Sequence, residues 1–278
     1  MRRGVMPPAY GKWNSVYQRF KRWRDKGIWE KILEKNVLKK PIKILILIPC
    51  FNESNNLSNV IDDIIKNADM HIDYLIIDDH STDESVQICK QNRYHHIRLP
   101  INLGIGGCMQ TGYQFAYEND YDIAIQFDGD GQHDAAYLHD LIAPLLRNEA
   151  DIVIGSRFIK KEGFQSTIMR RLGISFLSKM IFVFSKTRIQ DVTSGFRAVN
   201  KSYISLFSQK YASDYPEPEA ILDAALDGAR ILEVPVIMHE RLSGKSSINR
   251  LKSIDYLIKV SLTIILHRLI SKKKKRYI

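Results

Sequence analysis

The stretch Tyr121-Asp-Ile-Ala-Ile-Gln-Phe-Asp128-Gly-Asp-Gly-Gln-His-Asp134 joins an apolar run to a cluster of acidic side chains and glycines. The apolar part predicts a strand, and the acidic part follows where that strand would end. Asp128 and Asp130 are two residues apart, so in an extended chain their carboxylates can converge on one hard cation. The glycines allow a sharp turn and a close approach to a ligand. Asp and Gly are also common in plain turns, so the stretch needs support from the rest of the chain.

Strand and helix patterns alternate on both sides of this stretch. Apolar, β-branched runs predict strands at 42–48, 74–77, 96–99, 121–127 and 151–154. Helical patterns lie between them, at 56–67, 83–91, 104–117 and 135–146. This order predicts an α/β fold with a mostly parallel sheet flanked by helices.

Polar clusters follow four of the predicted strands: Pro49–Glu53, Asp78–Asp79, Gly104–Gly107 and Asp128–Asp134. Ligands of parallel sheets bind beyond the carboxyl ends of the strands. The four clusters therefore predict one binding rim. The second half of the chain is less regular, with predicted helices at 167–184 and from 215, a polar turn at 191–197 that enters a short strand, and a further strand at 231–237.

Length and charge limit the function classes. The chain has 278 residues, of which 45% are hydrophobic, enough for one large α/β domain or two small ones. The net charge of +10 favours a polyanionic partner, such as a nucleotide, a nucleic acid or an anionic membrane surface. The three cysteines lack metal or redox spacing and are expected to be reduced thiols. We expect neither a signal peptide nor a clear transmembrane helix, because no apolar run of sufficient length occurs.

Seven motifs, in order, resemble those of family 2 glycosyltransferases of the GT-A fold, and within them the dolichyl- and polyprenyl-phosphate sugar synthases. The resemblance covers about residues 42–250. The motifs are Pro49-Cys-Phe-Asn-Glu53, Asp78-Asp-His-Ser-Thr-Asp83, Asn102-Leu-Gly104, Asp128-Gly-Asp-Gly-Gln132, Gly155-Ser-Arg157, Ser194-Gly-Phe196 and Arg241 with Gly244-Lys-Ser246.

The resemblance implies a donor site and a metal site. The implied nucleotide-sugar contacts are Pro49, Asn52, Glu53, Asp79, Gly104, Asp128, Arg241 and Ser246. The implied ligands of Mg²⁺ or Mn²⁺ are Asp128, Asp130 and Gln132, a hard oxygen set. Arg241 resembles the arginine that clamps the donor diphosphate. Glu53 and Asp79 can alternatively serve as caps of the helices that follow them.

The resemblance also implies catalytic and acceptor residues. Asp130, Glu219 and Arg241 are the implied catalytic residues. Glu217 stays open as an alternative to Glu219, and both can instead be simple first-turn carboxylates of a helix. The implied acceptor-phosphate contacts are Arg157, Arg171 and Ser175. Arg171 and Ser175 are four residues apart and share a helix face, although Arg171 can also lie on a solvated face.

The two ends differ from the central pattern. Residues 254–270 are apolar over most of a helix circumference and are followed by Lys272-Lys-Lys-Lys-Arg276, which predicts an amphipathic, basic, membrane-associating tail over 251–278. A helix packed on the domain is the alternative. Residues 6–33 resemble an N-terminal fragment of insertion-sequence transposases, so 1–40 is expected to be a dispensable, basic helical extension of the 41–250 domain.

These expectations describe a metal-dependent, inverting glycosyltransferase. It would move a sugar from a nucleotide-diphosphate sugar to polyprenyl phosphate, for envelope polysaccharide or glycolipid synthesis. It would lie in the cytoplasm on the inner face of the membrane, with a small integral-membrane protein as a further partner and no specific nucleic acid. The alternatives are a transferase acting on a sugar hydroxyl of a growing glycan and, in another class, a nucleic-acid-binding protein or a membrane-bound pseudoenzyme.

Overall fold

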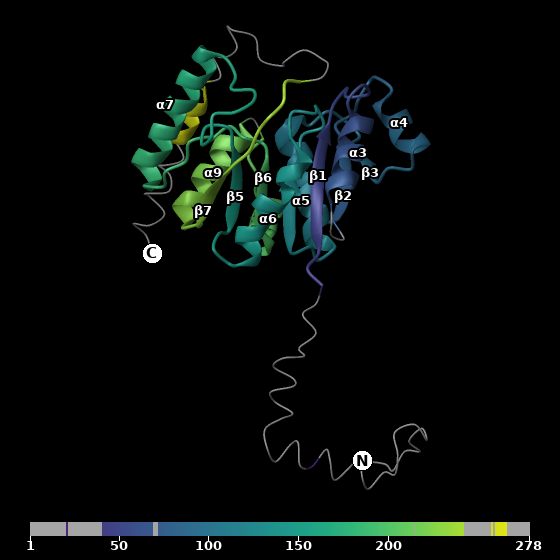
Figure 1. Cartoon of the computed structure of the whole chain (residues 1–278), viewed down its shortest axis with the longest axis horizontal. Helices are drawn as coiled ribbons and strands as arrows, with labels where there is room; N and C mark the ends of the chain where they lie inside the picture. The colour runs from purple at the N-terminus through teal and green to yellow at the C-terminus, as the bar shows by residue number, and fades with distance from the viewer. Residues whose placement is uncertain are drawn as a thin grey trace. The chain divides into compact units, whose positions relative to one another are not determined.

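The computed structural model describes Lys21 and residues 41–68, 72–213, 215–241, 257 and 259–265. The chain divides into two compact units, Met1–Ile42 and Lys43–Ile278. Nearly all of the described residues belong to the second unit (Figure 1). The fold and the site below are those of this second unit.

The second unit alternates strands with helices. Its strands are β1 (Ile44–Cys50), β2 (Ile72–Asp78), β3 (His96–Arg98), β4 (Ile123–Gln126), β5 (Ile152–Ser156), β6 (Arg197–Asn200) and β7 (Ile231–Pro235). Its helices are α3 (Leu57–Asn67), α4 (Ser85–Gln91), α5 (Gly104–Glu118), the short 3-10 helix η2 (Ala135–Tyr137), α6 (Leu138–Leu146), α7 (Ile168–Ser185), α8 (Lys201–Gln209) and α9 (Pro216–Asp227).

The strands form one seven-stranded sheet in the order β3-β2-β1-β4-β6-β5-β7. The neighbours in the first half, from β3 to β4, are parallel, and β5 is parallel to β7. β6 runs antiparallel to both β4 and β5. Because β6 is reversed, the loop that precedes it reaches the same edge of the sheet as the carboxyl end of β4.

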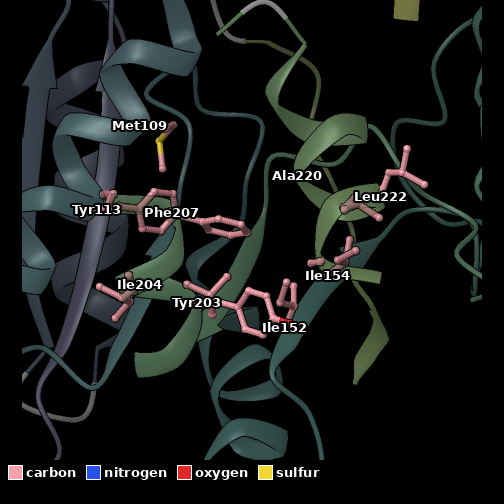
Figure 2. Close-up of a cluster of buried hydrophobic side chains, with 14 of the residues drawn as sticks. Met109, Tyr113, Ile152, Ile154, Tyr203, Ile204, Phe207, Ala220 and Leu222 are labelled. Carbon is pink, nitrogen blue, oxygen red and sulfur yellow. The ribbon is translucent and has the colours of Figure 1, made fainter. Parts of the chain in front are cut away.

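Alternate residues of the central strands face two separate cores. Leu45 and Leu47 of β1 pack into one core with α5, α7, α8 and α9. Ile46 and Ile48 of the same strand pack into the other with α3 and α6. Figure 2 shows the first core, where side chains of α5 and α8 meet the sheet and α9. The rings of Tyr113 and Phe207 lie 5.2 Å apart there. A strand covered on both faces must be apolar at every position, which explains the continuous run in β1.

The α/β fold with a mostly parallel sheet is confirmed. Most predicted elements exist with shifted ends: the strand expected at 42–48 is β1, and the helix expected at 135–146 begins with the 3-10 turn η2. One element is missing from the prediction, since helix α8 has no counterpart in it. The short strand expected after the polar turn is β6, and it runs antiparallel to its neighbours.

The C-terminal stretch is described at residue 257 and over 259–265. Val260 and Ile264 are fully buried in the same core as α7, whereas Leu262 and Ile265 are exposed. Leu257 lies against Gly173 of α7, where a Cβ atom would be 2.9 Å from Cδ1 of that leucine. One side of this stretch therefore packs on the domain, as the alternative reading of the sequence allowed. Among the described helices, none has the length and apolarity needed to cross a membrane.

Candidate functional site

A pocket of about 610 Å³ opens where β1, β2 and β4 end. The size suits a ligand of a few hundred daltons. Its walls come from the ends of these strands, the start of α5, the start of α9 and the chain after β7. The lining residues are Pro49, Cys50, Phe51, Asn52, Glu53, Asp79, Asn102, Gly104, Ile105, Cys108, Asp128, Gly129, Asp130, Glu217 and Arg241. The rim predicted from four polar clusters is thus one cavity.

Charged groups converge at one end of the pocket. The guanidinium of Arg241 donates to Oδ2 of Asp130 from Nε at 3.1 Å and from Nη2 at 2.9 Å. Asp128 lies on the other side of Gly129, and its side chain is about one-third exposed. Gly129 itself is in close contact with the backbone of β1, because a Cβ atom there would lie 3.0 Å from the carbonyl oxygen of Pro49. This spacing explains why a residue without a side chain separates the two carboxylates.

His133 is buried and contacts the backbone of Asp128. Its Nδ1 atom accepts a hydrogen bond from the backbone N–H of Asp128 at 3.0 Å, and its ring stacks on Phe196 with 4.7 Å between centroids. Burial lowers the pKa of the imidazole, although Asp128 and Asp130 oppose that shift. The neutral ring with its proton on Nε2 is the form that this hydrogen bond requires. His133 is therefore a packing residue of the loop.

Gly195, which lies just before the antiparallel strand β6, is in close contact with the carboxylate of Asp128. A Cβ atom at Gly195 would lie 2.6 Å from Oδ2 of Asp128 and 2.9 Å from Nε2 of Gln126. Gln126, the last residue of β4, donates from Nε2 to Oδ1 of Asp128 at 3.1 Å. The Ser194-Gly-Phe motif thus leaves space for the carboxylate of Asp128, which lies more than sixty residues earlier, just after β4. Sequence reasoning missed Gln126, because an amide inside an apolar run gives no periodic signal.

Asn52, Glu53 and Asp79 line the other parts of the pocket. Oδ1 of Asp79 accepts from the backbone N–H of Leu103 at 2.7 Å, which joins β2 to the turn before α5. Oδ1 of Asn52 accepts from the backbone N–H of Thr82 at 2.8 Å. Burial raises the pKa of Glu53, while hydrogen bonding from Asn56 and the charge of Arg241 oppose the rise. Asn52 and Asp79 therefore hold neighbouring loops, and all three side chains border the cavity.

Glu217, in the first turn of α9, borders the same cavity. Glu219 is buried on that helix and is not among the described pocket-lining residues. Burial raises the pKa of Glu217, and the nearby charge of Arg197 opposes the rise. Arg197 is almost fully buried and donates to the backbone carbonyls of Ser194 and Glu217. Glu217, and not the predicted Glu219, is therefore the carboxylate of this helix that borders the cavity.

Arg157 is occupied by a buried partner. Its Nε and Nη2 atoms donate to the two oxygens of Asp191 at 2.7 and 2.6 Å, and Asp191 is fully buried. Two backbone N–H groups, of Gln190 and Asp191, are held in turn by Glu233 at 2.8 Å. A phosphate would have to compete with this carboxylate, so the fork of Arg157 supports the loop before β6.

Arg171 and Ser175 lie on α7, and both are exposed. They share a helix face, as predicted from their spacing. They do not line the pocket described above.

Three of the remaining predicted site residues lie at or next to the pocket, and a fourth lies outside the described residues. Gln132 lies next to the pocket: its backbone N–H donates to Oδ1 of Asp130 at 3.0 Å, and its side-chain amide donates to the carbonyl of His239 at 3.4 Å. Ser246 lies outside the described residues. Gly104 and Pro49 both line the cavity, and Gly104 takes a φ of +74° at the start of α5, a conformation that favours glycine.

The charged end of the pocket fits a divalent cation bound together with a diphosphate. Asp128 and Asp130 supply hard carboxylate oxygens, the donor type that Mg²⁺ and Mn²⁺ prefer. The guanidinium of Arg241 already places one positive charge on Oδ2 of Asp130. Two protein carboxylates are enough when ligand phosphates complete the coordination.

The chain is similar to known glycosyltransferases. The family model for glycosyl transferase family 2 matches residues 45–207. A UDP-N-acetylglucosamine–dolichyl-phosphate N-acetylglucosaminyltransferase of Methanococcus voltae is 29% identical over 213 residues, covering 69% of this chain and 84% of that protein. An undecaprenyl-phosphate mannosyltransferase of Micrococcus luteus is 25% identical over 220 residues, and the alignment covers 75% of this chain and 88% of that protein.

Solved structures show the same fold at low identity. Glucosyl-3-phosphoglycerate synthase from Mycobacterium tuberculosis, in complex with Mn²⁺, UDP-glucose and phosphoglyceric acid, aligns with a TM-score of 0.64 and 17% identity. The alignment covers 83% of this chain and 80% of that one. The expected GT-A arrangement is confirmed.

Proposed function

Because this chain belongs to glycosyl transferase family 2, we propose that it moves a sugar from a nucleotide-diphosphate sugar to polyprenyl phosphate. The observation that carries the proposal is the convergence of Asp128, Asp130 and Arg241 at one end of a cavity of about 610 Å³. The chain is a glycosyltransferase, which sets aside the reading as a nucleic-acid-binding protein.

The donor would lie along the pocket. Its nucleoside would lie near Asp79 and Glu53, whose carboxylates can accept hydrogen bonds from a base N–H or a ribose hydroxyl. Its diphosphate would lie near Arg241, whose planar fork can bind phosphate oxygens in pairs. Arg241 pairs with Asp130 and lies 3.5 Å from Glu53, and its side chain is 28% exposed toward the pocket that the donor would fill.

Mg²⁺ or Mn²⁺, held by Asp128 and Asp130 with Gln132 next to them, would neutralise the charge of the departing nucleoside diphosphate. Gln126, Gly195 and His133 would keep the Asp128 carboxylate in place for that role. Arg241 would stabilise the same developing charge from the opposite side.

The reaction would proceed by direct displacement with inversion. An oxygen of the lipid phosphate would form a bond to the anomeric carbon as the bond from that carbon to the diphosphate oxygen breaks, and the nucleoside diphosphate would leave with the electron pair. A phosphate is already ionised at neutral pH, so this acceptor needs no general base. The names of the archaeal and bacterial relatives, a dolichyl-phosphate and an undecaprenyl-phosphate enzyme, support this acceptor class.

A sugar hydroxyl is the second candidate acceptor. The observation that favours it is the position of Glu217 in the pocket, because a hydroxyl must lose a proton as it attacks. Burial raises the pKa of Glu217, which makes its carboxylate a stronger base than an exposed one.

We also propose the remaining organisation from the sequence. Residues 41–250 would form the catalytic domain, 1–40 a dispensable extension and 251–278 a basic tail. The enzyme would work at the cytoplasmic face of the membrane for envelope polysaccharide or glycolipid synthesis, where a small integral-membrane protein is a further partner.

A screen of nucleotide sugars with polyprenyl phosphate tests the proposal. The readout is release of nucleoside diphosphate together with a sugar–lipid product. Release that depends on polyprenyl phosphate and on Mg²⁺ or Mn²⁺ would support it. Release that depends only on a glycan acceptor would favour the second candidate.

A further inference from the structure

Arg197, the first residue of β6, is a cationic side chain buried next to the pocket, with only 1% of its surface exposed. It lies opposite Gln126, the last residue of β4, so the two side chains are on the same face of the sheet. Nη1 of Arg197 donates to the carbonyl of Glu217 at 3.4 Å, and Nη2 donates to the carbonyl of Ser194 at 3.1 Å. One guanidinium therefore joins the first turn of α9 to the loop before β6.

Both of these contacts lead to a carboxylate at the pocket. Glu217 itself lines the cavity. Ser194 precedes Gly195, where a Cβ atom would lie 2.6 Å from Oδ2 of Asp128. Because the carboxylate of Asp128 packs this closely against the loop, a shift of the loop would move the carboxylate as well. Arg197 is thus linked to two acidic side chains of the same cavity.

The same two carboxylates balance the buried charge of Arg197. Its described hydrogen bonds are to carbonyl oxygens, and its Nε atom has no partner among the described residues. Burial raises the pKa of Glu217, and the charge of Arg197 opposes that rise. Burial lowers the pKa of Arg197, yet Glu217 and Asp128 are among the groups that raise it overall. The guanidinium and the carboxylates therefore stabilise one another in their charged forms.

Packing alone does not require a cation at this position. Burying a guanidinium is costly, and apolar side chains of similar volume can replace buried ions without loss of stability. Aromatic side chains pack closely in this part of the core, where the rings of Tyr113 and Phe207 lie 5.2 Å apart (Figure 2). The groups that Arg197 holds in place explain its presence better than the space that it fills.

We propose that Arg197 is a positioning residue of the transfer site, whose guanidinium fixes the carboxylates of Asp128 and Glu217 beside the bound donor. The inference rests on the proposed function, because it takes these carboxylates to face a metal-bound nucleotide diphosphate. Arg197 would not touch the donor. It would act on Asp128 through the loop before β6 and on Glu217 through the first turn of α9.

Binding of Mn²⁺ alone to the full chain tests the inference, with free Mn²⁺ measured by electron paramagnetic resonance. Two variants separate charge from geometry. Arg197→Met removes the cation, whereas Arg197→Lys keeps it but replaces the planar fork with a single ammonium. Asp130→Asn is the reference for a lost metal ligand.

Leu145→Ala is the matched control for loss of stability. Leu145 is buried near the end of α6, close to the edge of the sheet where β5 begins and away from the pocket. Its truncation should destabilise the core without reaching the carboxylates. A purely structural role would make the Arg197 variants behave like this control.

We expect Arg197→Met to weaken Mn²⁺ binding at least about fivefold and to lower kcat about 10- to 100-fold, because a misplacement of about 1 Å can cost that much. The KM for the donor should change less than about threefold, since other loops hold the nucleoside end near Asp79. Arg197→Lys should recover part of both losses. Leu145→Ala should keep Mn²⁺ affinity and kcat within about twofold of wild type while it unfolds at a lower temperature.

Wild-type Mn²⁺ affinity and wild-type kcat in both folded Arg197 variants would overturn the inference, even if they unfold more easily. If Arg197→Met does not fold, Arg197→Lys decides by the same two measurements. The proposed function is judged separately. If wild-type protein transfers no sugar to polyprenyl phosphate but Mn²⁺ affinity still falls in the Arg197 variants, the acceptor proposal fails and the positioning role stands.

Discussion

The guanidinium of Arg241 lies on the carboxylate of Asp130, although 111 residues separate them in the chain. The same Nη2 atom is 3.5 Å from Oε1 of Glu53. The pocket lining thus contains a cation close to two protein carboxylates. A donor diphosphate carries the same sign of charge as these carboxylates, so it can replace one of them as a partner of the guanidinium.

Asp130→Asn should lower turnover at least about 100-fold, because the leaving diphosphate loses a metal-bound charge partner. Turnover with Mg²⁺ or Mn²⁺ is the measurement. Asp62→Asn, an exposed carboxylate on α3, is the control and should stay near wild type. Wild-type turnover that persists in excess EDTA would contradict the metal assignment.

Glu217→Gln separates the two acceptor classes. With polyprenyl phosphate the variant should lose less than about tenfold in kcat, because an ionised phosphate needs no base. With a hydroxyl acceptor the loss should reach about 10²–10⁴-fold, and the acidic limb of the pH–rate profile, shifted upward by the raised pKa of Glu217, should disappear. Glu219→Gln is the comparison; a larger loss there than at Glu217 would restore the assignment made from the sequence.

Arg171→Ala should raise the KM for polyprenyl phosphate about 10- to 100-fold, because one charge-assisted contact to the phosphate is lost. Donor binding, measured by calorimetry, should stay within about threefold. Lys66→Ala, an exposed cation on α3, is the matched control. Lost donor binding with an unchanged KM for lipid would remove α7 from the acceptor site.

Asp191→Asn should lower the free energy of unfolding. It leaves the buried guanidinium of Arg157 without its carboxylate, which typically costs about 3–5 kcal/mol of unfolding free energy. Denaturant unfolding measures the loss. Replacing both partners with apolar residues, R157M/D191L, should recover part of it. An unchanged unfolding free energy in Asp191→Asn would instead free Arg157 for the acceptor role predicted from the sequence.

His133 predicts how stability depends on pH. Its pKa in the folded state is lowered below 6.5, so above that value the ring is neutral in both states and carries no penalty. As pH falls below 6.5 the unfolded chain binds a proton that the folded chain does not, and the unfolding free energy declines down to the folded pKa. Melting temperatures at pH 7.5 and 5.5 should show a larger drop for wild type than for His133→Asn. Equal drops would mean that other groups control the pH dependence.

The sequence predicts the first half of the sheet well, because its strands are continuous apolar runs separated by amphipathic helices. Each polar cluster after a strand does line the pocket, since the carboxyl ends of parallel strands meet at one edge. Helix α8 was not predicted, although Asn200 caps its first turn, because it is only nine residues long and follows β6 directly. The antiparallel direction of β6 depends on long-range pairing that local patterns do not encode.

The site was less predictable than the fold. Arg157 matches a motif, but the partner that occupies it, Asp191, becomes its neighbour only when the loop before β6 folds back. Glu217 and Glu219 are equivalent in sequence, and only the orientation of α9 distinguishes the one that borders the cavity. The need for glycine at position 195 is visible only in the structure, where the carboxylate of Asp128 occupies the space that a side chain would take.

The reversed strand β6 also constrains synthesis of the protein. Strands β3, β2, β1 and β4 are complete by Gln126, but the free edge of β4 is covered only when β6 emerges, beginning at Arg197. At about 5–20 residues per second the ribosome needs roughly 4–14 s for those intervening residues. During that interval the backbone N–H and C=O groups on one edge of β4 (Ile123–Gln126) have no β6 to pair with. An unpaired strand edge can pair with another chain, so we expect aggregation to start most readily in this interval.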